Sequence, residues 1–329
     1  MAVAHSTPLE RIRGSVSTDL AAVDSTTRRE LTSDVALVNQ VSDYIIAGGG
    51  KRLRPLLVLL AARAAGAQPL GPQVPAAVVI EFIHTATLLH DDVVDGSDQR
   101  RGRDAAHTVF GNATSVLVGD FLYSRAFQIM VRLNSLRVLD ILADATNLIA
   151  EGEVLQIMNA GDPDTTEERY LAVIHRKTAK LFEAGAQIAA VVTGAGADVE
   201  NALARYGRHL GNAFQLVDDA LDYQGSHAER GKNVGDDLAE GKPTLPLIHA
   251  LRQTTGAEHE ALRRAVEQGG LAELPRVLAA IESTGGLEYT LGLAKREADQ
   301  ALAALESLPG SIHREALKSL AMFAVERTF

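Results

Sequence analysis

Two short clusters of aspartates are the residues of this sequence best suited to chemistry. Each has the pattern Asp-Asp-x-x-Asp within an apolar stretch of helical spacing. Side chains four residues apart share one face of an α-helix, so the outer aspartates of each cluster face the same way. Such carboxylates repel each other unless a cation lies between them, and Mg²⁺ suits one or two carboxylates together with phosphate oxygens. The clusters are Asp91, Asp92 and Asp95, and Asp218, Asp219 and Asp222.

Other polar residues share the helical faces of these aspartates. His84 and Thr87 lie two turns and one turn before Asp91 on one stripe, from which Asp92 turns to the side. Gln215 lies one turn before Asp218 and faces the same way. A single acidic cluster is more often part of the solvated surface than a functional site. Two clusters with equal spacing favour a common function.

Basic residues follow the first cluster closely. Arg100, Arg101 and Arg103 carry forked guanidinium groups that match phosphate geometry. Acids that hold a metal beside arginines that hold phosphate predict a metal-bridged diphosphate site. We expect the two acidic clusters to hold that diphosphate from opposite sides.

Three further basic segments are candidates for the same anion. A turn after Gly48-Gly49-Gly50 carries Lys51 to Arg54; it lacks the strand and the Ser or Thr of a phosphate-binding P-loop, so that interpretation fails. His175 to Lys180 lies within a helical run, and the glycine-rich loop 230–244 carries Lys232 and Lys242. Solvated turns remain the alternative for the turn after Gly50 and for the loop.

Composition excludes several classes of function. The chain has 329 residues, 46% of them hydrophobic and only 4% aromatic, which is typical of packed helices. A formal charge of −10 argues against nucleic acid as a partner. The lack of cysteine excludes disulfides and thiolate metal sites and agrees with a cytoplasmic protein. No signal pattern and no apolar run of membrane-spanning length is present, so we expect a soluble protein.

Helical periodicity extends along nearly the whole chain. No convincing strand alternation and no linker is visible, which predicts an all-α protein. We expect residues 1–30 to form a partly helical N-terminal arm and residues 31–329 to form one domain. The expected helices are 33–47, 56–67, 73–96, 113–133, 136–160, 165–195, 198–224, 243–255, 258–268, 271–284, 287–306 and 311–326.

From about Ser33 to near its C-terminus, the sequence resembles the trans-polyprenyl diphosphate synthases. The motifs that carry the resemblance occur in the family's order. They are GGGKRLRP, HTATLLHDDVVD, RRGR, GNATSVLVGDFLYSRAF, AEGEVLQIMN, KTAKLFEAG, FQLVDDALDY and GKNVGDDLAEGKPTLP. More narrowly, the chain is similar to the bacterial octaprenyl type, which makes quinone side chains.

This resemblance implies a fold, partners and site residues. The fold would be a large helical bundle around a deep central cavity. Proteins of this family usually form homodimers. The first substrate, isopentenyl diphosphate, would be held by Lys51, Arg54, His84 and Arg101. The allylic diphosphate would be held by Arg100, Lys177, Lys232 and Lys242, and by Mg²⁺ on Asp91, Asp95 and Asp218, with Asp92, Asp219 and Asp222 completing the clusters. Lys177, Thr178 and Gln215 would be catalytic, the last two facing the allylic cation.

Small residues before the first acidic cluster predict an open product tunnel. Ala86 and Thr87 stand where short-chain members of the family tend to carry an aromatic residue, and Ala77 lies deeper on the same face. Phe127 and Met130 are candidates for the tunnel floor, with ordinary core packing as the alternative. A long product would bury about 0.8 kcal/mol per CH₂ and would favour transient membrane contact on release.

Three other functions are weaker alternatives. A metal phosphohydrolase would use the His90-Asp91 pair but would need further histidine ligands and would leave the second cluster unexplained. A terpene cyclase would be expected to carry an Asn/Ser/Glu-type second metal site instead of DDALD. A non-catalytic partner subunit would be expected to have lost one acidic cluster.

Overall fold

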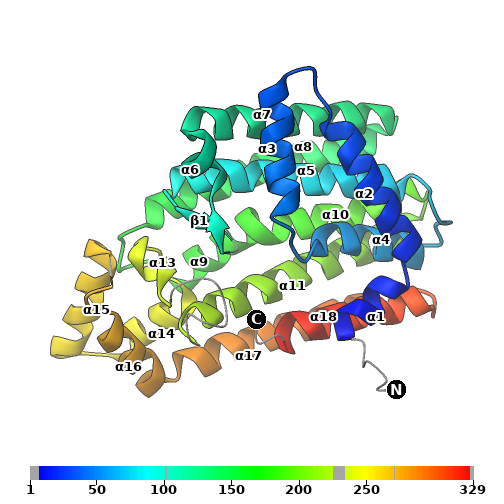
Figure 1. The fold of residues 1–329 in the computed structure, drawn as a ribbon. Helices are drawn as coiled ribbons and strands as arrows, with labels where there is room; N and C mark the ends of the chain where they lie inside the picture. The colour runs from blue at the N-terminus through cyan, green and yellow to red at the C-terminus, as the bar shows by residue number, and fades with distance from the viewer. Residues whose placement is uncertain (1–6, 101, 225–233, 270, 327–329) are drawn as a thin grey trace, which may run out of the picture. The chain divides into compact units, whose positions relative to one another are not determined.

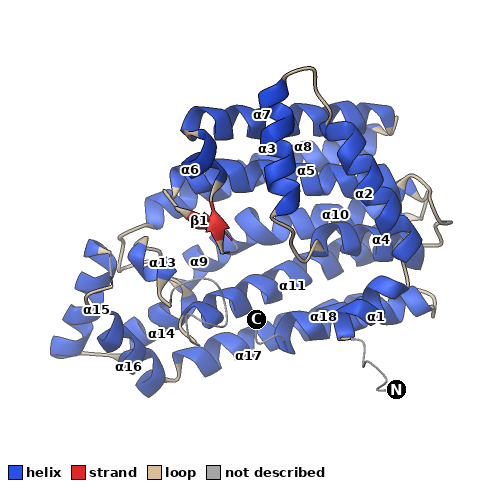
Figure 2. Ribbon diagram, in the orientation of Figure 1, coloured by secondary structure: helices blue, strands red, loops and turns tan. Residues whose placement is uncertain are grey.

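The computed structural model describes residues 7–100, 102–224, 234–269 and 271–326, and these residues are mostly helical (Figure 1; Figure 2). Within those ranges the strands are β1 (Gln99–Arg100) and β2 (Arg103–Asp104), an antiparallel hairpin with Gln99 opposite Asp104. The prediction of an all-α fold is confirmed. Among the described helices, none combines the length and the apolar character that crossing a membrane requires.

Helices make up most of the described residues. In chain order they are α1 (Pro8–Gly14), α2 (Ser17–Leu31), α3 (Ala36–Ala47), α4 (Leu53–Ala64), α5 (Gln73–Val94), α6 (Ala106–Phe110), α7 (Asn112–Arg132), α8 (Leu136–Asn159), α9 (Glu167–Ile174), a π-helix η1 (His175–Ala179), α10 (Lys180–Val192), α11 (Ala197–Asp222), α13 (Asp236–Ala239), α14 (Leu245–Gln253), α15 (Gly256–Gln268), α16 (Leu274–Thr284), α17 (Gly286–Ala304) and α18 (Ile312–Glu326). Most of the individually predicted helices have bounds within three residues of the expected ones. The helix expected over 165–195 is divided into α9, η1 and α10, and α6 and α13 were not predicted.

The chain divides into two compact units. The first unit comprises residues 1–146, 181–207 and 304–320, and the second comprises residues 147–180, 208–303 and 321–329. The first acidic cluster belongs to the first unit and the second cluster to the second unit. A single domain over residues 31–329 stays a prediction.

Helix α5 is the central element of the first unit. It packs on α7, α4 and α2, and its residues Val78, Val79 and Ile80 are fully buried, because the helix is apolar on nearly every side in this part. A helix that is apolar all round is stable only when neighbours cover it. Its last turn is different, since it carries the acidic cluster. The covered part of α5 therefore holds that turn in a fixed place.

The second unit is built around α9, α11 and α14. An apolar cluster joins these helices to α17 and contains Tyr170, Ile174, Leu216, Val217, Leu245, Ile248 and Ala294. Helix α11 ends at Asp222, so its last turn carries the second acidic cluster next to this core. In each unit, the acids therefore follow a buried helical segment.

The start of α4 differs from the prediction. The sequence predicts a helix over residues 56–67, but α4 begins three residues earlier, at Leu53, and contains Pro55 in its first turn. Proline is tolerated there because the first four N–H groups of a helix have no partner within it. Arg52, the preceding residue, has a φ of 44° in the left-handed region, which turns the basic segment sharply into the helix.

Candidate active site

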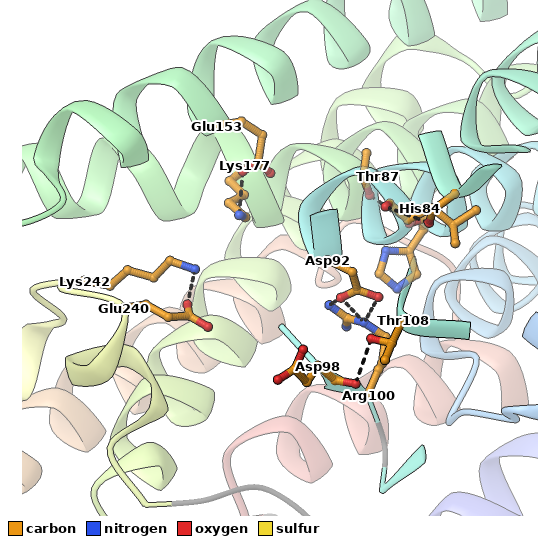
Figure 3. Close-up of polar contacts among 12 residues, drawn as sticks. His84, Thr87, Asp92, Asp98, Arg100, Thr108, Glu153, Lys177, Glu240 and Lys242 are labelled. Atoms are coloured by element: carbon orange, nitrogen blue, oxygen red, sulfur yellow. Dashed lines mark hydrogen bonds and ion pairs between the residues drawn. The ribbon is translucent and has the colours of Figure 1, made fainter. Parts of the chain in front are cut away.

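The first acidic cluster lies at the C-terminal end of α5. Asp92 is 2% exposed, and the Arg100 Nε donates to both of its carboxylate oxygens, at 2.7 and 2.9 Å (Figure 3). Asp91 and Asp95 are only partly covered. The sequence predicts that Asp92 turns to the side of the stripe. In the structure, this carboxylate holds Arg100 of the β1–β2 hairpin.

Two residues expected to bind isopentenyl diphosphate meet in the first unit. The Arg54 Nη1 lies 2.9 Å from the His84 Nε2. An arginine can only donate, so the Nε2 accepts and the proton of a neutral imidazole is on Nδ1. The Arg54 guanidinium also lies 4.5 Å from the centroid of the Phe182 ring. These contacts hold Arg54 on the His84 side of α5, while Lys51 is exposed on the preceding turn.

A cavity of about 990 Å³, including its open mouth, lies beside His84 in the first unit. Polar residues line one part of it and apolar residues another, and the lining includes His84, Asp92, Arg100, Ile45, Ile46 and Leu122. Such a cavity suits a small molecule with an anionic head and an apolar tail. The five predicted tunnel residues are all described by the structure, and none lines this cavity.

The second acidic cluster has the same division of roles. Asp219 is 4% exposed; the Tyr170 hydroxyl donates to its Oδ2 at 2.5 Å and the Gln215 Nε2 donates to its Oδ1 at 2.6 Å. Asp218 is exposed, and Asp222 accepts from the backbone N–H of Asp237 at 3.2 Å. In both clusters, the middle aspartate is buried and bonded while the outer ones are more accessible.

Negative charge is concentrated around the second cluster. Burial and the neighbouring carboxylate of Asp237 raise the pKa of Asp219 well above its usual range, although the hydrogen bonds from Tyr170 and Gln215 oppose this. Burial, and next the charge of Asp219, raise the pKa of Tyr170. A group of acids that repel one another in this way is stabilised by bound cations.

The π-helix η1 presents Lys177 and Thr178 in the second unit. π-Helices are rare and occur often at functional sites. The Thr178 hydroxyl donates to the Gln215 Oε1 at 3.0 Å, so the structure brings these two residues together. A Cβ on Gly152 of α8 would lie 2.7 Å from the Lys177 backbone nitrogen, so only glycine permits this approach.

Lys177 and Lys242, two lysines expected to bind the allylic diphosphate, are each paired with a glutamate. The Lys177 Nζ lies 2.5 Å from the Glu153 Oε2, and the Lys242 Nζ lies 2.5 Å from the Glu240 Oε2 (Figure 3). The pairs are partly buried, with 20% and 19% of the lysine side chains exposed. A diphosphate that binds these lysines competes with the two carboxylates.

The remaining predicted residues have varied positions. Arg101 and Lys232 lie outside the described residues. Ala77, Ala86 and Met130 are buried, and the Thr87 hydroxyl donates to the backbone carbonyl of His84 at 2.8 Å. Phe127 is 43% exposed on α7, so within one chain it is a surface residue.

Sequence reasoning missed Tyr170, Glu153 and Glu240. Tyr170 lies in an apolar helical run. Because a buried tyrosine hydroxyl usually has a hydrogen-bond partner, its position there was the sequence feature that could have indicated a polar contact. Glu153 precedes Lys177 by 24 residues, and Glu240 belongs to a loop of mixed charge. No spacing rule relates either glutamate to its lysine.

Comparison with known proteins confirms the resemblance. The polyprenyl synthetase family matches residues 35–281. Octaprenyl diphosphate synthase of Escherichia coli (strain K12) is 54% identical over 320 residues, 97% of this chain and 99% of that protein. All-trans-nonaprenyl-diphosphate synthase (geranyl-diphosphate specific) of Rhodobacter capsulatus is 46% identical, covering 95% of this chain and 96% of that protein. The crystal structure of polyprenyl synthase from Caulobacter crescentus CB15, complexed with calcium and isoprenyl diphosphate, has a TM-score of 0.93 at 47% identity and covers 98% of both chains. The chain therefore belongs to the polyprenyl synthetase family.

Proposed function

We propose that this protein is a Mg²⁺-dependent trans-prenyltransferase that adds isopentenyl diphosphate repeatedly to an allylic diphosphate until an octaprenyl-like product is formed. The observation that carries the proposal is the pair of acidic clusters. Asp92 and Asp219 are buried and bonded, and the outer aspartates of each cluster are more accessible to a ligand. This arrangement occurs in a chain 54% identical to an octaprenyl diphosphate synthase.

The donor set of the clusters fits Mg²⁺. Carboxylate oxygens are the ligands this ion prefers, and it takes the rest of its six ligands from substrate phosphate and water. Among the described side chains, no three from His, Asp or Glu converge into a metal-binding group. When bound, Mg²⁺ supplies Lewis-acid stabilisation of the departing diphosphate. The proposed ligands are Asp91, Asp95 and Asp218, with Asp222 beside them.

We assign the two substrates to different residues. The Arg54–His84 pair and the adjoining cavity suit isopentenyl diphosphate, because a cationic group there adjoins apolar lining residues. Lys51 and Arg101 remain predicted contacts of the same diphosphate. The allylic diphosphate is assigned to the three cations that hold chain carboxylates in Figure 3, namely Arg100, Lys177 and Lys242, and to Lys232.

The reaction breaks one bond and forms another. The C–O bond of the allylic diphosphate ionises, and Lys177 and Arg100 stabilise the negative charge on the leaving group. The Thr178 and Gln215 dipoles face the allylic carbon as positive charge develops. The double bond of isopentenyl diphosphate attacks this carbon, and one proton is lost to form the new trans double bond. The released diphosphate is the acceptor we assign to that proton. Holding both substrates in line supplies much of the rate.

Product length depends on the space below the first cluster. Named relatives make octaprenyl and nonaprenyl products, and the higher identity belongs to the octaprenyl enzyme. Small residues at Ala77 and Ala86 support a long tunnel, with Met130 as its floor. The product would supply quinone side chains, and its long apolar chain favours transient membrane contact on release.

We further propose a homodimer formed through α7. Leu117, Phe127 and Val131 are 66%, 43% and 71% exposed on this helix. Their spacing places them along one helical stripe, and a stripe of large apolar side chains in contact with water marks an interaction surface. In this assembly Phe127 would be covered by the second copy.

Elongation assays test the proposal. The purified protein is incubated with labelled isopentenyl diphosphate, farnesyl diphosphate and Mg²⁺, and the products are separated by length. Asp91→Asn should lower kcat by about 100-fold or more, as expected when a direct charge contact to the leaving group is lost. Asp98→Asn is the matched control, because Asp98 is exposed just before the hairpin and accepts hydrogen bonds from Thr108 and Ala105 through its backbone carbonyl. Equal activity of both variants would contradict the assignment of Asp91.

A further inference from the structure

A continuous chain of hydrogen bonds links Tyr170 to Thr178 through the second acidic cluster. The Tyr170 hydroxyl donates to Asp219 at 2.5 Å, the Gln215 amide donates to Asp219 at 2.6 Å, and the Thr178 hydroxyl donates to Gln215 at 3.0 Å. These four residues come from α9, η1 and α11 of the second unit. The proposed function uses Thr178 and Gln215 but gives no role to Tyr170.

The chemistry of the groups fixes the direction of every bond in this chain. The ionised form of Asp219, which a cation bound to the cluster favours, only accepts hydrogen bonds, so it accepts one from each neighbour. The two ends of an amide differ, since the NH₂ end donates and the oxygen accepts. Because the NH₂ of Gln215 faces Asp219, its oxygen must face Thr178. The threonine hydroxyl has one proton and donates it to that oxygen.

This direction has a consequence for the allylic cation. Because the Thr178 hydroxyl donates its hydrogen bond to Gln215, the lone pairs of its oxygen point toward other neighbours. A dipole with its negative end toward a developing cation stabilises the transition state, and the reversed hydroxyl would oppose it. We infer that Tyr170 and Asp219 are positioning residues that set the orientation of the Thr178 hydroxyl, an inference that rests on the proposed prenyltransferase function.

The Tyr170 ring is well placed to fix the direction of these hydrogen bonds. It is 5% exposed and lies in the apolar cluster with Ile174, Leu216 and Ile248. A packed ring carries its hydroxyl with little freedom, so Asp219 Oδ2 has a fixed donor. Without this donor, the carboxylate still accepts from Gln215 but can turn about its own bond. The amide of Gln215 then loses its fixed acceptor.

Tyr170→Phe tests the inference, with Tyr206→Phe as the matched control. Tyr206 is also fully buried, and its hydroxyl donates to the Leu317 carbonyl at 2.7 Å in the first unit. Both changes remove one buried hydroxyl and one hydrogen bond. Tyr170→Phe should lower kcat by about 10- to 100-fold, the usual effect of losing a partner of a metal-site carboxylate. The KM values of both substrates should stay within about threefold, and Tyr206→Phe should keep the wild-type kcat.

A binding measurement separates orientation from simple loss of structure. Two unreactive farnesyl diphosphate analogues are compared by titration calorimetry with Mg²⁺. One has an ammonium nitrogen beside the diphosphate, and the other is the thiodiphosphate, which carries no positive charge. Tyr170→Phe should bind the ammonium analogue about tenfold more weakly, because the lone pairs of Thr178 no longer face its charge. It should bind the thiodiphosphate as the wild type does.

The outcomes distinguish this inference from the proposed function. If the wild-type protein elongates farnesyl diphosphate but Tyr170→Phe matches it in kcat and in both affinities, the positioning role is wrong and the proposed function stands. If both analogues lose affinity equally, Tyr170 supports the fold of the site and not the hydroxyl direction, which also overturns the inference. If the wild type does not elongate, the proposed function itself fails.

Discussion

The Lys177 Nζ and the Glu153 Oε2 lie 2.5 Å apart between η1 and α8 (Figure 3). Glu153 is thus a counter-ion of Lys177 that the chain itself supplies. It therefore orients Lys177, and it would compete with a diphosphate that binds the same ammonium group. Partly exposed ion pairs of this kind contribute up to about 1 kcal/mol.

Glu153→Gln should strengthen allylic diphosphate binding. With the competing charge removed, the KM for the allylic substrate should fall by up to about fivefold, the factor that corresponds to 1 kcal/mol. Glu151→Gln is the control, since Glu151 lies on the same helix, is half exposed and is 3.8 Å from Arg176. Steady-state kinetics at fixed Mg²⁺ measures both variants. A rise in KM for Glu153→Gln would show that orientation of Lys177 outweighs competition.

Gly152→Ala should damage the site through the backbone. The added Cβ would lie 2.7 Å from the Lys177 nitrogen and 3.0 Å from the Arg176 Cβ, so η1 or α8 must move. We expect a loss of about 1–3 kcal/mol in unfolding free energy, as for other overpacked positions, together with a fall in kcat. Thermal and denaturant unfolding measure the first effect and elongation assays the second. Gly14→Ala, where nothing lies within 4 Å, should leave both unchanged.

Ala86→Tyr should shorten the product. Ala86 is fully buried on α5, one turn and one residue before Asp91, where a larger side chain would close the predicted tunnel. The series Ala86→Val, Ala86→Phe and Ala86→Tyr should give progressively shorter products in mass spectra. Thermal unfolding of each variant shows whether it remains folded. Folded variants with wild-type product length would remove this part of α5 from the tunnel.

His313 should make stability depend on pH. Burial, and next the charge of Arg63, lower the pKa of His313 below its usual 6.5, although Asp19 and the Ser15 carbonyl oppose this. The folded protein therefore binds this proton less readily than the unfolded chain. Stability from this group is present above pH 6.5 and is lost as pH falls below that value. The drop in Tm between about pH 7.5 and about pH 5.5 should be smaller for His313→Gln than for the wild type, and an equal drop would contradict the prediction.

Much of the helical framework follows from the sequence alone. The segments at 73–94 and 112–132 have the expected helical bounds within two residues, because apolar periodicity and glycine or proline at the ends specify them directly. The stripe on α5 was also predicted, including the sideways position of Asp92. These features depend on residues close in sequence, whose geometry is set by the helix itself.

Long-range pairings could not be predicted in the same way. Helical spacing indicates which face Lys177 occupies, but it does not name Glu153 as its partner or Tyr170 as the donor to Asp219. The π-helix at 175–179 and the left-handed Arg52 depend on packing and on local turns that periodicity does not report. The site assignments, the cytoplasmic location and the homodimer stay predictions.

Product analysis of the purified full-length protein tests the central claim most directly. The protein is incubated with isopentenyl diphosphate and farnesyl diphosphate, with Mg²⁺ or with excess chelator, and the prenyl diphosphates are measured by mass spectrometry. We expect octaprenyl diphosphate as the main product with Mg²⁺ and unextended farnesyl diphosphate with chelator. Farnesyl diphosphate that stays unextended in the presence of Mg²⁺ would contradict it.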